Sequence, residues 1–161
     1  CTAGQGLDRR FWEKARKGAA DMTKVMLTCG DYQFFARLEE EKAPRTCAIF
    51  KKMLPIEDRL IHVRWSGEGM WIPMGDTRWE GLDFENHTSY PSKGELLIYP
   101  GGISEMEMIL AYGGVSFASK VGQLAGNHVL TITEGLDQLY ELGRKTLYEG
   151  AQNIRIELAE D

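Results

Sequence analysis

The chain has 161 residues, of which 43% are hydrophobic and 27% are charged, and its formal net charge at pH 7 is −5. This length suits one domain with a normal core, and no stretch approaches the run of about 18 apolar residues that a membrane-spanning helix needs. The basic residues are interspersed with acidic ones, so a nucleic-acid partner is not expected either.

The three cysteines indicate the redox compartment. Cys1, Cys29 and Cys47 lie far apart and show no CxxC spacing, which indicates neither a metal knuckle nor a complete disulfide framework. A reducing cytoplasm fits this pattern best, and we expect a soluble cytoplasmic protein without a cofactor. The chain begins with Cys rather than Met, so a removed signal peptide stays open as an alternative.

The first predicted element is an amphipathic helix near the N-terminus. It begins at a capping-type residue, Asp8, and places apolar side chains at steps of three and four residues as far as Met22. We therefore expect residues 1–22 to form a helical extension and residues 23–161 to form a single domain.

From Lys24 the hydrophobic period changes to two, which predicts strands. The stretch KVMLTCGDYQFFARL contains a turn at Cys29-Gly30-Asp31, so we expect a β-hairpin here. The next stretch, EKAPRTCAIF, has Pro44 in its first turn, and the chain reaches Pro55 eleven residues later. Apolar residues between these two prolines recur at helical spacing, which predicts one helix that packs a single face on a sheet.

The remaining elements follow in a mixed order. Leu60–Trp65 and Met70–Met74 are predicted to form a second hairpin around a Ser-Gly-Glu-Gly turn, and residues 75–93 to form a long loop. The stretches GELLIYP, EMEMILAYG and NHVLTIT are strand-like, with a loop from Gly113 to Gly126. Thr131 to Glu134 is interpreted as a capping box before a second helix, and NIRIEL as the last strand.

This order predicts a mainly β fold with some α-helix. Closing the antiparallel strands into a barrel removes exposed strand edges, and two helices can cover the apolar ends of the barrel. A closed antiparallel barrel capped by two helices is therefore expected in preference to a flat sheet.

Two segments resemble the cyclophilin family. Ala43, Pro44, Thr46 and Phe50 match the segment that begins the first cyclophilin helix, and Leu124, Gly126, His128, Val129, Glu134 and Gly135 match a later segment that precedes the second helix. More closely, the chain is similar to a bacterial family of cyclophilin-like proteins of unknown function, in which segments like APRTC recur. The resemblance implies a cyclophilin-like barrel from Lys24 to about Leu158, and it supplies no settled activity.

The resemblance also implies one concrete enzyme activity, the cis-trans isomerisation of X-Pro peptide bonds. The catalytic arginine of cyclophilins corresponds to Arg64 in HVR, and His128 corresponds to a pocket histidine. The aromatic wall and the glutamine that follow that arginine are replaced here by WSGEGMWIPM, and Gln123 stands at a tryptophan position. Whether the chain is an enzyme therefore stays open, with a degenerate isomerase as one alternative.

The replacements suggest a different pocket. Its candidate apolar walls are Trp65, Met70, Trp71, Tyr99, Met106, Met108 and Tyr112, and its candidate polar groups are Arg64, Glu68, Glu105, Glu107, Gln123, Asn127 and His128. A core position is the alternative for each aromatic residue and methionine, and an ion pair with Glu68 or Glu107 is the alternative for Arg64. We expect Arg64 and His128 to face one cavity.

The functional prediction is a pocket for a small organic ligand or a peptide. The alternatives are the proline isomerase and a non-catalytic interaction or assembly module, which an exposed apolar patch around Phe11, Trp12 or Trp79 would favour. No metal is expected, because Glu85 and His87 have no third ligand at suitable spacing. The sequence leaves a homo-oligomer open.

Overall fold

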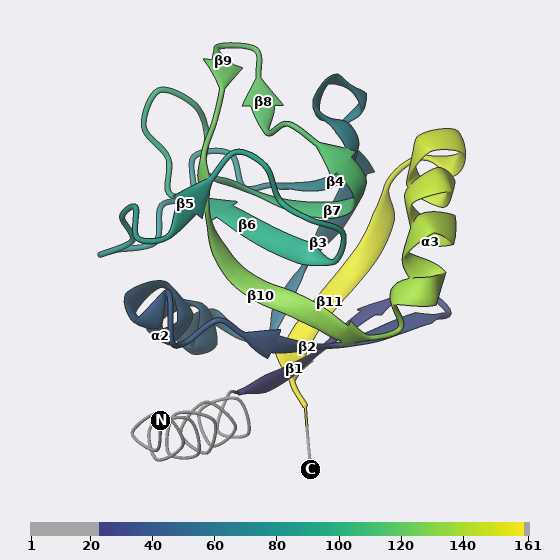
Figure 1. Ribbon diagram of the computed structural model, residues 1–161, viewed down its shortest axis with the longest axis horizontal. Coiled ribbons are helices and arrows are strands. Elements are labelled where there is room, and N and C mark those ends of the chain that lie inside the picture. The colour runs from purple at the N-terminus through teal and green to yellow at the C-terminus, as the bar shows by residue number, and fades with distance from the viewer. Residues whose placement is uncertain (1–22, 160–161) are drawn as a thin grey trace, which may run out of the picture.

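Eight strands form a closed antiparallel barrel in the computed structural model, which describes residues 23–159 (Figure 1). Around the barrel the order is β2-β1-β11-β3-β4-β7-β6-β10, and pairing of β10 with β2 closes the ring. The strands are β1 (Lys24–Cys29), β2 (Tyr32–Leu38), β3 (Ile56–His62), β4 (Gly67–Pro73), β6 (Glu95–Tyr99), β7 (Glu107–Val115), β10 (Gly126–Glu134) and β11 (Gln152–Leu158). The predicted closed barrel is confirmed, and the flat sheet is excluded.

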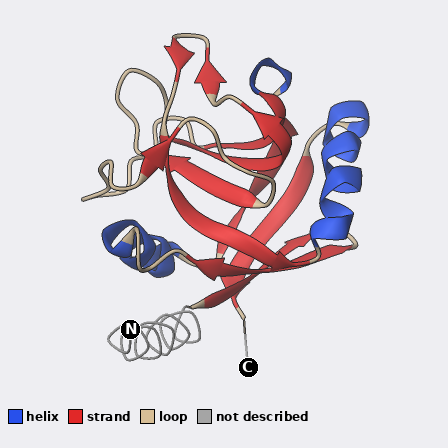
Figure 2. Cartoon of the chain, in the orientation of Figure 1, coloured by secondary structure: helices blue, strands red, loops and turns tan. Residues whose placement is uncertain are grey.

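Two α-helices lie on opposite sides of the barrel in the described part of the chain (Figure 2). They are α2 (Pro44–Met53) and α3 (Leu136–Glu149), and the shorter elements are the 3₁₀ helix η1 (Arg64–Ser66) and the strands β5 (His87–Thr88), β8 (Ala118–Ser119) and β9 (Gly122–Gln123). The predicted helix over residues 8–22 lies outside the described residues. No helix within residues 23–159 has the length and apolar character needed to cross a membrane.

The main core fills the barrel and includes both helices. Val25, Leu27 and Cys29 of β1 alternate with more exposed residues, as a strand with one buried face requires. Phe50 of α2 and Leu142 of α3 belong to the same buried cluster as these strand residues. Both helices therefore close one core, as the sequence predicted.

A second, smaller buried cluster lies on the other face of β6 and β7. Residues of β7 divide between the two cores by alternation, since Met108 and Leu110 belong to the main cluster whereas Ile109 and Ala111 belong to the second. This is why β7 is buried on both faces. The second cluster forms the base on which the candidate site is built.

The predicted capping box at Thr131 is wrong. β10 continues to Glu134, where it pairs with Phe35 of β2, so Thr131 is part of a strand. Its hydroxyl donates a hydrogen bond to Glu39 Oε1 at 2.7 Å. The N-cap of α3 is Gly135, in the left-handed region with φ 96°, and it makes no side-chain cap.

The strand predicted over Leu60–Trp65 begins and ends earlier. β3 covers Ile56–His62, and the chain then forms η1 before β4 starts at Gly67. Gly67 has φ 112° and lies against the backbone of Gly114, a position that a side chain would not fit. The turn thus starts before Arg64, and Arg64 and Trp65 leave the sheet.

Candidate functional site

A pocket of about 810 Å³ lies beside the second core cluster. The short strand β8, which contributes to its lining, is at the upper end of the barrel in Figure 1. The walls of the pocket come from η1, from β4 and β7, from the loops after β4 and before β7, and from the segment around β8. The lining residues are Val63, Trp65, Ser66, Trp71, Arg78, Gly102, Ile103, Ser104, Glu105, Glu107, Ile109, Phe117, Ala118, Ser119 and Lys120. The pocket therefore combines an apolar wall with a small number of charged groups.

Glu107 is the most buried charged residue of this pocket. It is the first residue of β7 and is only 5% exposed. Trp71 of β4, the neighbouring strand, donates a hydrogen bond from Nε1 to Glu107 Oε2 at 2.8 Å. Glu107 and Ile109 lie on the same face of β7, since side chains alternate along a strand, so the carboxyl group faces the pocket and not the main core.

The environment of Glu107 changes its protonation. Burial raises the pKa of this carboxyl to about 7, the Trp71 hydrogen bond opposes the rise, and the nearby Glu105 carboxylate adds to it. No lysine or arginine within residues 23–159 forms an ion pair with Glu107. The group can therefore exchange a proton close to neutral pH, inside an aromatic pocket.

Two tryptophans form the aromatic wall. Trp65 and Trp71 meet edge to face, with ring centroids 6.0 Å apart and an interplanar angle of 74°. Trp65 is 60% exposed, yet its Nε1 donates a hydrogen bond to the Ala118 carbonyl at 3.1 Å. The Ser66 hydroxyl makes two hydrogen bonds with the backbone of Ala118. It donates to the Ala118 carbonyl at 3.2 Å and accepts from the Ala118 N–H at 3.1 Å. These bonds fix η1 against β8 and hold the exposed indole at the mouth of the pocket.

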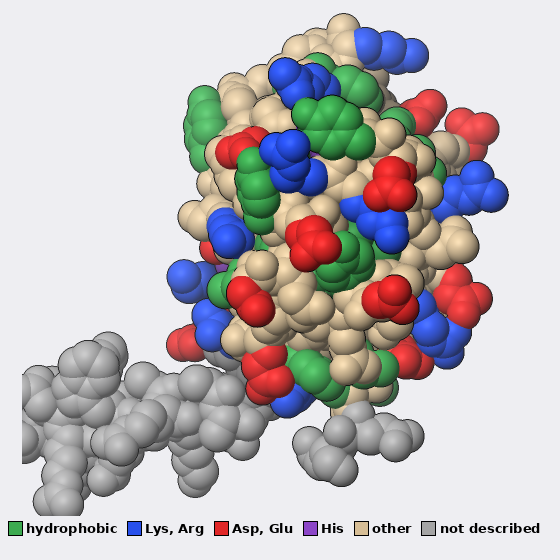
Figure 3. All heavy atoms as spheres, turned by 90° about the vertical axis from the view of Figure 1, so that its right-hand side faces the viewer, with side chains coloured by type: hydrophobic (Ala, Val, Ile, Leu, Met, Phe, Trp, Pro, Cys, Tyr) green, Lys and Arg blue, Asp and Glu red, His purple; other side chains and the backbone are tan. Residues whose placement is uncertain are grey.

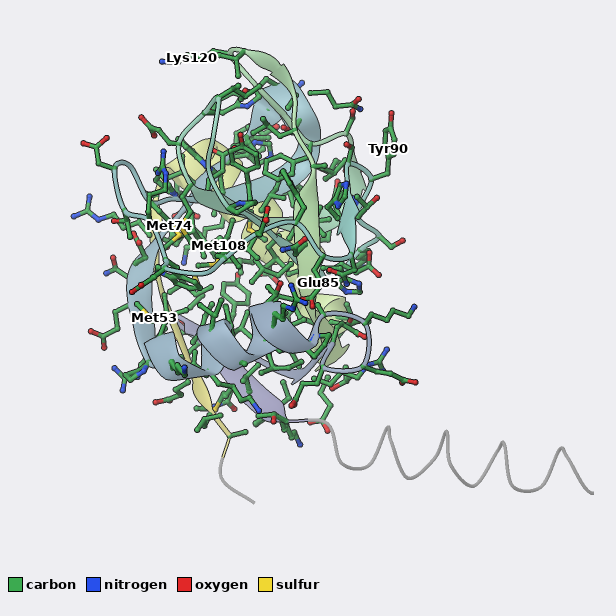
Figure 4. The ribbon with its side chains drawn as sticks, turned by 90° about the vertical axis from the view of Figure 1, so that its left-hand side faces the viewer. Met53, Met74, Glu85, Tyr90, Met108 and Lys120 are labelled. Atoms are coloured by element: carbon green, nitrogen blue, oxygen red, sulfur yellow. The ribbon has the colours of Figure 1, made fainter. Side chains whose placement is uncertain are left out.

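The remaining charged groups of the pocket come from loops. Arg78 donates from Nη1 to the carbonyls of Gly75 at 3.1 Å and Thr77 at 2.8 Å, which holds its guanidinium near its own loop. Lys120 lies at the tip of the β8–β9 hairpin (Figure 4). Glu105 is also exposed, so both signs of charge are present among the lining residues.

The structure brings together only part of the predicted set. Trp65, Trp71, Glu105 and Glu107 line the pocket. Met70, Met106, Met108 and Tyr112 instead belong to the main core, as the core alternative for such side chains allowed, and Tyr99 belongs to the second cluster without lining the pocket.

Three predicted polar residues also lie elsewhere. Glu68 Oε1 accepts a hydrogen bond from the Gly114 N–H at 3.1 Å. Gln123 donates to the Tyr90 hydroxyl at 2.9 Å. Asn127 is fully buried behind α2. None of the three is among the lining residues.

Arg64 and His128 do not share a cavity. Arg64 is exposed on η1, and its positive charge influences the protonation of His62 and Tyr112. The Nε2 atom of His62 lies 2.6 Å from the Tyr112 hydroxyl. Within residues 23–159 Arg64 forms no ion pair with Glu68 or Glu107. The two predicted catalytic residues are therefore placed in different surroundings, and neither lines the pocket.

His128 belongs to a polar group on β10. Its Nε2 lies 2.7 Å from the Thr131 hydroxyl, 3.7 Å from Glu95 Oε2 and 4.0 Å from Glu39 Oε1. Residues three apart on a regular strand point to opposite faces, but β10 has an irregular register between His128 and Leu130. That irregularity explains why His128 turns toward Thr131.

Asn127 fixes the long loop to α2. Its amide donates to the Thr46 hydroxyl at 3.1 Å and to the Asp83 carbonyl at 2.8 Å, and its oxygen accepts the Glu85 N–H at 2.8 Å. Glu85 in turn accepts hydrogen bonds from the Thr46 N–H at 3.0 Å and the Thr46 hydroxyl at 2.9 Å, at the start of α2 (Figure 4). Burial raises the pKa of Glu85, but these bonds outweigh it and hold the pKa below its ordinary value. The cluster is a helix cap made by a distant loop.

The lining residues that sequence reasoning missed include Arg78, Ile103, Phe117 and Lys120, which lie in loops, and Ile109 in β7. The predicted loop at residues 75–93 was the only signal for Arg78. Cys29 and Cys47 are free and buried, and burial raises the pKa of Cys29 to about 11 and that of Cys47 to about 12, so neither is a reactive thiol. No group of three metal-binding side chains occurs in the described part of the chain.

The face formed by α3 offers exposed aromatic side chains without a pocket. Tyr140 and Tyr148 are exposed, and the Arg144 guanidinium lies 5.8 Å and 5.2 Å from their ring centroids. On this face hydrophobic side chains are dispersed among acidic and basic ones (Figure 3). Trp79, predicted as part of a patch under the interaction-module alternative, is buried and packs 6.1 Å from Phe50, while Phe11 and Trp12 lie outside the described residues.

Comparison with known proteins gives a family and a fold. Residues 25–158 match the family described as "Protein of unknown function (DUF3830)". No curated protein matches the chain. The structure titled "Structure of McbB in complex with tryptophan" is similar with a TM-score of 0.63 and 16% identity, over 85% of this chain and 45% of that one. This chain therefore spans less than half the length of that protein.

A second similar structure is the "Solution structure of the hypothetical protein AF2241 from Archaeoglobus fulgidus". It has a TM-score of 0.55 and 15% identity, over 86% of this chain and 95% of that one. At these identities the two similarities show a common fold and nothing more.

Proposed function

We propose that this chain, which belongs to the DUF3830 family of proteins of unknown function, binds a small organic molecule in the pocket between η1, β4, β7 and β8. The observation that carries the proposal is the hydrogen bond from Trp71 to the buried Glu107 in the wall of that pocket. It combines an aromatic surface with one buried, specific polar group.

The shape and composition of the pocket support this proposal. Small-molecule sites are concave, mostly apolar spaces of about 300 to 1,000 Å³ with a few well-placed polar groups. The volume here, about 810 Å³, lies in that range. Trp65, Trp71 and Phe117 supply apolar contacts, and Glu107 supplies a polar group that can fix the orientation of a ligand.

Aromatic compounds are the first class to test. An exposed indole fixed by a hydrogen bond, as in Trp65, offers a rigid surface for stacking at small entropic cost. The similar structure of McbB was solved in complex with tryptophan, which supports starting with aromatic amino acids and related compounds.

Thermal-shift screening followed by calorimetry tests the proposal. A ligand that binds the folded state raises the melting temperature by mass action, so a panel of small aromatic amines, acids and amides should contain compounds that do so. Trp65→Ala should weaken their binding about 10-fold, as expected for a well-packed aromatic contact. Tyr148→Ala, on α3 and not among the lining residues, is the matched control and should leave binding unchanged. A panel in which no compound binds would refute the proposal.

Proline isomerisation is the second candidate function. The resemblance to cyclophilins supports a cyclophilin-like classification of the barrel, and Arg64 is exposed beside His62 and Tyr112, where a peptide could reach it. A protease-coupled assay with an X-Pro peptide tests this candidate. Acceleration that Arg64→Ala abolishes would support it, whereas the absence of acceleration would remove it.

A non-catalytic interaction module is the remaining alternative. An exposed apolar patch around Phe11, Trp12 or Trp79 would favour it, but Trp79 is buried, and the other two residues lie outside the described part of the chain. The predicted cytoplasmic location and the predicted absence of a nucleic-acid partner stay predictions. So does the choice between a monomer and a homo-oligomer.

A further inference from the structure

We infer that the ligand of this pocket carries a protonated amine, which pairs with the Glu107 carboxylate while the rest of the ligand lies against Trp65 and Trp71. This inference rests on the proposed binding function and adds the charge of the ligand to it. The recognised class is thus organic ammonium compounds, with amino acids among them.

The first argument is the isolation of Glu107. A carboxylate this buried is normally paired with a cation, because loss of hydration destabilises the charge. The neighbours of Glu107 on its face of β7 are Ile109 and Ala111, both apolar, and no basic residue of the described chain reaches it. A cationic ligand would supply the missing partner.

The second argument is that one oxygen of the Glu107 carboxyl group, Oε1, is free to bind a ligand. Trp71 bonds Oε2, and no hydrogen-bond donor within residues 23–159 reaches Oε1. Glu107 nevertheless lines the pocket, and its Oε1 is not among the buried polar atoms that lack a partner. Oε1 therefore has access to the pocket space and can accept a hydrogen bond from a ligand N–H.

The third argument concerns the surrounding groups. The faces of indole rings attract cations, so Trp65 and Trp71 favour an ammonium group over an anion near Glu107. The other charged side chains of the pocket are Glu105, Arg78 and Lys120. Glu105 adds to the negative potential near Glu107, and neither Arg78 nor Lys120 forms an ion pair with it.

Binding of an amine at Glu107 should be coupled to release of a proton. The raised pKa of Glu107, about 7, means that the empty site is partly protonated at neutral pH. An ammonium group favours the carboxylate, so binding releases a proton near neutral pH. Affinity for an amine should therefore increase from about pH 5 to about pH 8, as Glu107 ionises and an alkyl amine stays charged.

Calorimetry with three indole probes of similar size tests the inference. Tryptamine carries an ammonium group, tryptophol is neutral, and indole-3-acetate is an anion. We expect tryptamine to bind about 10-fold more tightly than tryptophol at pH 8, and indole-3-acetate to bind more weakly than both.

The Glu107→Gln variant separates charge from shape. Glutamine keeps an oxygen that accepts the Trp71 hydrogen bond and removes the negative charge. Tryptamine affinity should fall about 30-fold in this variant, whereas tryptophol affinity should stay within about 3-fold. Glu141→Gln on α3, outside the pocket, removes an equal charge and should change neither affinity.

A second measurement does not depend on a variant. Titration of tryptamine into the unaltered protein at pH 7, in two buffers of different ionisation enthalpy, should show proton release on binding. The inference is overturned if tryptophol binds as tightly as tryptamine, or if tryptamine binds without releasing a proton; the proposed pocket then still stands on tryptophol binding. If none of the three probes and no panel compound binds, the proposed function and the inference are both wrong.

Discussion

Trp71 and Glu107 are joined across the β4–β7 pair by a hydrogen bond of 2.8 Å from the indole Nε1 to the carboxyl Oε2. Both residues lie on the outward face of the barrel wall, above the second core cluster. This contact places one buried carboxyl group in an aromatic pocket, and the first two predictions below depend on it.

Replacing Glu107 with glutamine should stabilise the protein at alkaline pH. Because the folded-state pKa of Glu107 is raised from 4.5 to about 7, the folded state binds more protons than the unfolded state between these values. The contribution of Glu107 to stability therefore falls as pH rises through this window. Glutamine does not titrate, so its advantage should grow from pH 5 to pH 8 by up to about 3 kcal/mol. Urea unfolding of both proteins at the two pH values measures this difference, and an equal difference at both would contradict it.

Removing the Trp71 hydrogen bond should raise the pKa of Glu107 further. The indole N–H stabilises the charged carboxylate, so Trp71→Phe, which keeps an aromatic ring and loses the donor, should move the pKa above about 7. Carbon-detected NMR titration of the Glu107 carboxyl follows this change directly. Tyr148→Phe on α3 is the control, and an unchanged or lower pKa in Trp71→Phe would show that burial alone sets the value.

Asn127 should be essential for stability without contributing to ligand binding. Its buried side chain joins Thr46, Asp83 and Glu85 through three hydrogen bonds. Asn127→Ala leaves buried polar groups without partners and should cost about 2 to 4 kcal/mol of unfolding free energy. Asn153→Ala, at an exposed position on β11, should cost less than about 0.5 kcal/mol. Chemical denaturation of the two variants compares them, and equal stabilities would contradict the role assigned to the loop cluster.

Gly143 should tolerate no side chain. A Cβ at this position of α3 would overlap the ring of Tyr112, which packs beneath the helix in the main core. Gly143→Ala should therefore destabilise the protein by about 1 to 3 kcal/mol, although alanine favours helices. Gly114→Ala is the matched control, since a Cβ there meets no atom closer than 4.0 Å. If the thermal midpoints of both variants equal that of the parent protein, the proposed close packing of α3 on Tyr112 is wrong.

The fold could be predicted because its signals are local. The alternation of Val25 and Leu27 marks a strand, and the spacing of Cys47 and Phe50 between two prolines marks a helix. These patterns depend on which face of each element is buried, and a closed barrel satisfies them all at once. The turn at Gly67 was misplaced because its position depends on close contact with Gly114, which lies far away in the sequence.

The part of the site that could be predicted lies in or beside the strands β4 and β7. Trp71 and Glu107 were proposed because they stand where the pocket residues of cyclophilins are replaced, and both line the pocket here. Arg78 and Lys120 come from loops whose course no periodicity determines. His128 was misassigned to the pocket because the irregular register of β10, which redirects its side chain toward Thr131, has no local sequence signal.

The most direct test of the ligand pocket uses the tryptophan side chains as reporters. The described chain contains Trp65 and Trp71 in the pocket wall and Trp79 in the main core. In proton-nitrogen NMR spectra, addition of tryptamine should shift the indole N–H signals of Trp65 and Trp71 in a saturable way and leave that of Trp79 unchanged. Saturable binding that shifts neither Trp65 nor Trp71, or the absence of any shift at millimolar tryptamine and tryptophol, would contradict the assignment of this pocket as a ligand site.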